Sequence, residues 1–112
     1  MSMDPKFRCK LEKAIVLALI DECDKVGYRP FRVYDGSESL YTATAQRALD
    51  AIFAVDDSTV YFTDLHVREI NWVKLVGGNG EDIISDYTCG DRVFESAVMA
   101  VMERIKDAKV VV

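Results

Sequence analysis

The sequence predicts an α+β fold in which three helices pack on a mainly antiparallel sheet of three or four strands, in the order α-β-α-β-β-β-α. Two observations predict it. Apolar residues recur at helical spacing near both ends of the chain and in residues 37–54, whereas residues 59–87 contain runs of β-branched and aromatic residues. The 112 residues are half hydrophobic, which favours one domain over residues 1–112.

The first predicted helix covers residues 5–26. Asp4 suits the N-cap, Pro5 suits the first helical position, and Gly27 suits the residue after the helix. A short edge strand over residues 31–34 follows, because Pro30 lacks the amide proton that a central strand uses.

The second predicted helix covers residues 37–54. Asp35 and Glu38 resemble a capping box, with Asp in the place of Ser or Thr. One apolar face of this helix is formed by Tyr41, Ala45, Ala48, Leu49, Ile52 and Phe53.

Three strands are predicted next, over residues 59–63, 70–76 and 82–87. Asn79-Gly80 favours a type I′ hairpin turn between the last two strands. Such a turn places Val76 opposite Ile83, Lys74 opposite Ser85, and Trp72 opposite Tyr87 as an aromatic pair. Gly77-Gly78 leaves a wider loop or a bulge open as alternatives.

The third predicted helix starts after Asp91, which suits its N-cap. Its apolar stripe consists of Phe94, Ala97, Val98, Val101 and Ile105. The three valines at 110–112 are expected to add a short strand or to meet a partner. This tail, together with a partly covered sheet, favours a homodimer.

Charge and apolar content exclude several classes of protein. The net charge of −5 argues against direct nucleic-acid binding. The longest apolar run, at 14–20, is far shorter than the about 20 residues of a membrane span. Cys9 and Cys23 lie roughly 21 Å apart on one predicted helix, so they do not pair. Free thiols favour a cytoplasmic location.

No catalytic or metal-binding constellation is evident in the sequence. His66, the single histidine, lies in a polar connection, and Cys89 precedes a helix start. Neither has a partner that spacing assigns to it. The residues also lack zinc or calcium spacing, so no cofactor and no metal is expected.

Two sets of residues are candidates for binding. A stretch without Lys or Arg carries acidic residues, and aromatic residues flank it, so the predicted partner-binding residues are Glu81, Asp82, Asp86, Asp91, Trp72 and Tyr87. A candidate ligand loop is formed by Gly77, Gly78, Asn79 and Gly80. Aromatic residues are numerous for a small domain, among them Tyr28, Phe31, Tyr34, Tyr41, Tyr61, Phe62, Trp72 and Tyr87. If the helices cover one face of the sheet, those outside the core lie on the open face, as a dimer interface or a binding surface.

Residues 72–87, which read WVKLVGGNGEDIISDY, resemble a stretch found in small uncharacterised bacteriophage proteins. The resemblance covers 16 residues and implies a phage accessory protein in the host cytoplasm that binds and blocks a host or anti-phage defence protein.

These observations favour a non-enzymatic interaction protein that inhibits or modulates a protein partner. The alternative is a protein that binds or sequesters a nucleotide at a dimer interface near the candidate ligand loop. An enzyme remains a third hypothesis, in which His66, Cys89 or the carboxylates of Glu81, Asp82 and Asp86 converge in one pocket.

Overall fold

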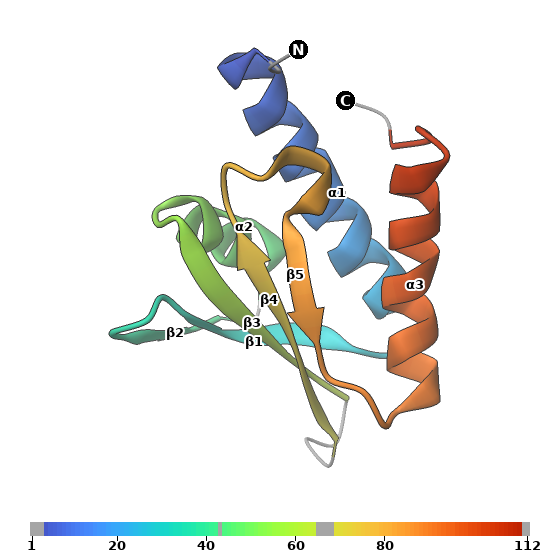
Figure 1. The fold of residues 1–112 in the computed structure, drawn as a ribbon. Helices are drawn as coiled ribbons and strands as arrows, with labels where there is room; N and C mark the ends of the chain where they lie inside the picture. The colour runs from blue at the N-terminus through green and yellow to red at the C-terminus, as the bar shows by residue number, and fades with distance from the viewer. Residues whose placement is uncertain (1–3, 43, 65–68, 111–112) are drawn as a thin grey trace.

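The computed structural model describes residues 4–42, 44–64 and 69–110 (Figure 1). Within them, three helices lie against one antiparallel five-stranded sheet, in the strand order β2-β1-β3-β4-β5. The predicted α+β class is confirmed. The sheet has five strands instead of three or four, because residues 39–41, in the first part of the second predicted helix, form a strand that pairs with the strand before it.

Helix α1 (Pro5–Lys25) confirms the first predicted helix. The Asp4 carboxylate accepts hydrogen bonds from the backbone N–H groups of Lys6 and Phe7, at 2.8 and 3.4 Å, which satisfies two free donors at the helix start. Gly27 has a φ of +91°, a conformation that glycine adopts without strain after a helix. The buried face of α1 consists of Leu11, Glu12, Ile15, Val16, Leu19, Ile20 and Cys23.

The helix predicted over residues 37–54 is wrong in its first part. Strand β1 (Arg29–Tyr34) turns into strand β2 (Ser39–Tyr41), and helix α2 (Ala45–Phe53) begins only after its N-cap Thr44. The Asp35 carboxylate accepts from the N–H groups of Ser37 and Glu38, at 2.8 and 2.7 Å. An Asp side chain makes the same local bonds in a turn as at a helix start, so the apparent capping box was ambiguous.

The prediction of an edge strand after Pro30 is also wrong, because β1 lies between β2 and β3 (Asp57–Thr63). Proline is tolerated there because β2 pairs only with residues Arg32–Tyr34 of β1. In the described part of the chain, β3 is the one strand that pairs with Pro30, and the register shifts between Pro30 and Arg32.

The predicted hairpin register is correct near the turn and wrong beyond it. Strand β4 (Ile70–Val76) is followed by a short 3-10 helix, η1 (Gly80–Asp82), and by strand β5 (Ile84–Tyr87). The Val76 N–H donates to the Ile83 carbonyl, at 2.9 Å, as the predicted pairing requires. The register then slips by one residue.

A bulge causes this slip. Leu75 pairs with Ile84, but Lys74 pairs with Asp86, so Ser85 is the extra residue. Trp72 therefore binds Thr88 instead of facing Tyr87, and Tyr87 pairs with Val73. Asn79 has a φ of −91°, which is incompatible with a type I′ turn.

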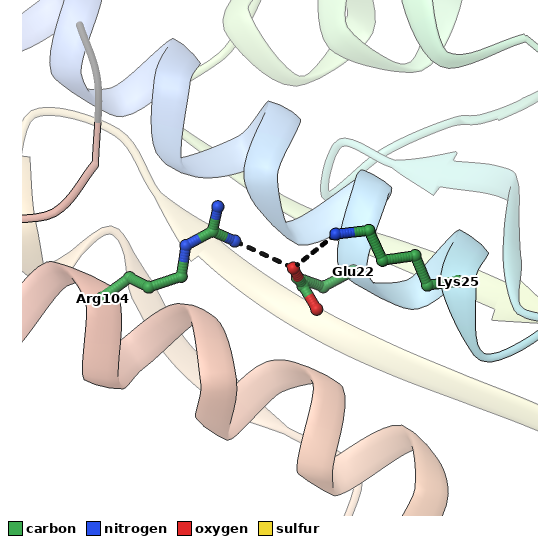
Figure 2. Close-up of polar contacts among 3 residues, drawn as sticks. All are labelled: Glu22, Lys25 and Arg104. Atoms are coloured by element: carbon green, nitrogen blue, oxygen red, sulfur yellow. Dashed lines mark hydrogen bonds and ion pairs between the residues drawn. The ribbon is translucent and has the colours of Figure 1, made fainter.

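Helix α3 (Arg92–Lys106) confirms the third predicted helix and its Asp91 N-cap. It packs beside α1, and a surface ion-pair cluster links the two helices (Figure 2). The Glu22 carboxylate in this cluster binds Arg104 at 3.0 Å and Lys25 at 3.1 Å. Such exposed pairs contribute little to stability, so the apolar stripes provide most of the helix–helix attraction.

The hydrophobic core lies between the helices and one face of the sheet (Figure 1). Phe62 from β3 and Phe94 from α3 meet near its centre, with their rings 5.5 Å apart. Val110 packs on the edge of the core, and Lys109 and Val110 do not belong to a strand. The rest of the predicted tail strand, residues 111–112, lies outside the described residues.

Candidate functional site

The two faces of the sheet are covered differently. Alternate residues of β3 and β4 point toward the helices and are buried, among them Val60, Phe62 and Val73. The residues between them point to the other side. No helix within residues 4–42, 44–64 and 69–110 covers that side, which we call the open face.

A row of four large side chains crosses the open face. Tyr41 of β2 pairs with Arg32 of β1, Arg32 pairs with Tyr61 of β3, and Tyr61 pairs with Trp72 of β4. Directly paired residues of antiparallel strands share a face, with Cβ atoms about 5 Å apart. We call these four residues the aromatic row. Tyr41 at its end is 67% exposed, and the other three are partly exposed.

Arg32 is the centre of positive charge in this row. Its guanidinium carbon lies 3.8 Å from the centroid of the Tyr61 ring, a cation–π geometry. The Arg32 Nε atom is buried and has no hydrogen-bond acceptor among the residues that the structure describes. Within the described residues, no carboxylate forms an ion pair with Arg32.

The two other cations in the described strands of the open face each have an acid beside them. Arg29 binds the Asp24 carboxylate at 3.3 Å, and Lys74 stands directly across from Asp86. Asp86 is thus the one residue of the predicted acidic set that shares a face with the aromatic row.

The remaining acidic residues of that set are dispersed. Glu81 and Asp82 are exposed in η1, before β5, whereas Asp91 follows β5 at the start of α3 (Figure 1). The four carboxylates therefore do not form one continuous strip. Trp72 and Tyr87 are also separated, because the bulge turns Tyr87 toward the helices, where it packs on the core.

Asp91 has structural partners. Its carboxylate accepts hydrogen bonds from the N–H groups of Val93 and Phe94, at 3.0 and 3.2 Å, and from the Tyr28 hydroxyl. The bond from Tyr28 lowers the pKa of Asp91, and burial, together with this bond, raises the pKa of Tyr28. Asp91 therefore connects α3 to the segment between α1 and β1.

The candidate ligand loop binds a side chain of the protein itself. One Glu12 carboxylate oxygen accepts from the N–H groups of Gly78 and Gly80, at 2.8 and 2.7 Å. Glu12 is only 5% exposed. A shallow pocket of about 300 Å³ beside the loop also contains Arg8 and the acidic residues of η1. Two of the donors that could bind a phosphate there are thus occupied by an internal anion.

The residues of the enzyme hypothesis are only partly described. His66 lies outside the described residues, and Cys89 is exposed just before α3. Its thiol is free, as are those of Cys9 and Cys23. Burial raises the pKa of Cys23 to about 12, which makes this thiol a poor nucleophile. The described residues contain no group of three metal-ligating side chains.

Sequence reasoning named the aromatic residues of the row but not Arg32, and it did not bring the four together. The missing information was the pairing of β1 with β3, which joins residues about 30 positions apart. The two-residue alternation within each strand was visible, but a row across strands depends on their order in the sheet.

None of the helices in the described part of the chain combines the length and the apolarity that crossing a membrane requires. No protein-family model, curated protein or solved structure matches the chain.

Proposed function

We propose that the chain is a non-enzymatic interaction protein that binds a partner protein on the open face of its sheet and thereby inhibits or modulates it. The observation that carries the proposal is the aromatic row, which lies across four strands on a face that no helix of the described residues covers. Tyr, Trp and Arg are the residue types that contribute most to binding energy in protein interfaces.

The resemblance of residues 72–87 supports a phage accessory role, with a host or defence protein as the partner in the host cytoplasm. The partner-binding residues differ in part from those that the sequence favoured. Trp72 and Asp86 stay in the proposal because they lie on the open face. Tyr87 and Asp91 leave it because they pack and bind within the fold.

A photo-crosslinking experiment tests the proposal. A photoreactive phenylalanine derivative is placed at Tyr41 on the open face or at Leu17, which is 47% exposed on α1. Each protein is irradiated in a bacterial host lysate, and adducts are identified by mass spectrometry. We expect one specific protein adduct from position 41 and none of that mass from position 17.

Two double variants then establish whether the contact is specific. Tyr61→Ser with Trp72→Ser removes open-face rings, whereas Leu17→Ser with Met99→Ser removes exposed apolar side chains from the helices. The adduct should disappear only with the first pair. Adducts that form equally from both positions, or that survive loss of both rings, would contradict the proposal.

A further inference from the structure

Arg32 points to the chemistry of the partner. It lies within the aromatic row, flanked by Tyr41 and Tyr61, so a partner that covers the row also removes Arg32 from water. Burying a charge without a counterion costs several kcal/mol. Because no carboxylate of the described residues pairs with Arg32, the partner has to supply the anion.

We propose, resting on the function proposed above, that the partner protein presents an Asp or Glu carboxylate to Arg32, flanked by apolar groups that lie over Tyr41 and Trp72. The guanidinium already lies over the Tyr61 ring, 3.8 Å from its centroid, so the cation needs little ordering on binding. The N–H groups of the Arg32 guanidinium donate to the oxygens of the partner's carboxylate in a charge-assisted pair.

The charges of the open face favour a carboxylate of a protein over a nucleic-acid strand. Proteins that bind single strands combine stacking rings with a basic groove along the backbone. Arg32 is the one cation in the described strands of the open face that neither forms an ion pair nor stands across from an acid, since Arg29 binds Asp24 and Lys74 faces Asp86. A run of phosphates would approach Asp86 and the net charge of −5, whereas a single carboxylate needs one cation.

A peptide-display selection against the immobilised full chain tests the inference, with random 12-residue peptides as probes. We expect enriched peptides to carry an Asp or Glu next to aromatic or aliphatic residues. Their affinity should fall at least about tenfold for Arg32→Gln and less for Arg32→Lys, which keeps the charge but loses the planar group. Arg47→Gln on α2 removes the same charge from an exposed helix position and should change nothing.

A double-mutant cycle sharpens this result. Replacing the enriched acid of a peptide by its amide should weaken binding to the wild-type chain, but hardly weaken binding to Arg32→Gln, because both changes remove the same pair. Additive losses would overturn the inference.

Other outcomes separate the inference from the proposed function. Enriched peptides whose binding needs Tyr61 and Trp72 but no acidic residue would overturn the inference of a partner carboxylate and would still agree with the proposed function. Peptides indifferent to both rings, or no enriched peptides, would count against both. If a labelled dT12 or rU12 strand binds more tightly than the peptides, and this binding depends on Trp72, the partner is a nucleic acid and not a protein. If light scattering shows that the wild-type chain is a dimer and the Arg32→Gln variant is a monomer, the partner on the open face is a second copy of the chain.

Discussion

The two faces of the one sheet have opposite surroundings although the same strands form both. In β3, Val60 and Phe62 are almost fully buried beneath the helices, while Tyr61 between them is partly exposed on the open face. In β4, Val73 is buried and its neighbour Trp72 is not. Because successive side chains of a strand point to opposite faces of the sheet, neighbouring residues lie in different environments.

The difference separates stability from recognition. Apolar surface removed from water stabilises the fold by about 25 cal/mol per Å², so the helix-covered face provides most of the stabilisation. The rings of the open face keep part of their apolar surface in contact with water. Burying that surface against a partner contributes free energy to binding. Substitutions on the two faces should therefore have separable effects, from large changes in stability to none.

The largest loss is expected for Phe62→Ala. Phe62 is 0% exposed and packs on Phe94, so the variant creates a cavity and should lose about 3–5 kcal/mol of unfolding free energy. Urea denaturation measures it, and Phe62→Leu, with a smaller loss, serves if the alanine variant does not fold. A similar loss for the adjacent Tyr61→Ala would contradict the contrast between the faces.

Glu12→Ala tests whether the β4–η1 loop belongs to the helix-covered side. The variant leaves the Gly78 and Gly80 N–H groups without their acceptor, and Gly80 is buried. We expect a loss of about 2–3 kcal/mol in the same urea measurement. Glu12→Gln keeps one acceptor oxygen and should lose less. Equal losses for both variants would show that the hydrogen bonds are not the cause.

Asp91→Ala should cost about 1–2 kcal/mol at pH 7, because α3 loses its N-cap and Tyr28 loses its acceptor. The folded state lowers the pKa of Asp91, so its ionised form stabilises the fold above the ordinary value of 3.8. This contribution disappears as the pH falls through the lower folded-state pKa. Urea curves at pH 7, 4 and 3 should therefore show the difference from wild type shrinking at the acid end, and a constant difference would refute the linkage.

The smallest effect on stability is expected for Tyr41→Ser on the open face. Tyr41 is 67% exposed, so the free energy of unfolding should change by no more than about 0.5 kcal/mol. The Tyr41→Ser substitution should nevertheless reduce the yield of crosslinking to the partner from a photoreactive group placed at Tyr34 of β1. A stability loss above 1 kcal/mol would mean that the aromatic row supports the fold itself.

Local patterns predicted the elements whose signals do not depend on the rest of the chain. The Asp4-Pro5 start, the Gly27 end and the Asp91 cap were correct because capping bonds form within a few residues. The pattern at Asp35 and Glu38 was misread because a hairpin turn uses the same bonds as a helix cap. Tyr41, predicted on the apolar face of that helix, lies instead in strand β2 on the open face.

The hairpin shows where a strong local signal is overruled. Asn79-Gly80 favours a tight turn, yet two backbone N–H groups of the loop bind the carboxylate of Glu12, more than 60 residues earlier in the chain. The loop forms η1, and the bulge at Ser85 shifts the strand by one residue. A shift of one residue moves each later side chain to the other face, which separated Trp72 from Tyr87.

The sequence alone determined the class of the fold, helices α1 and α3, the second part of the helix predicted over residues 37–54, and strands β3 and β4, because periodicity and capping are properties of neighbouring residues. Tertiary structure decided the order of the strands, the register of β5 and the assembly of the aromatic row around Arg32. These features depend on pairings between distant segments, and their free energy comes from contacts that form only when the whole sheet is in place.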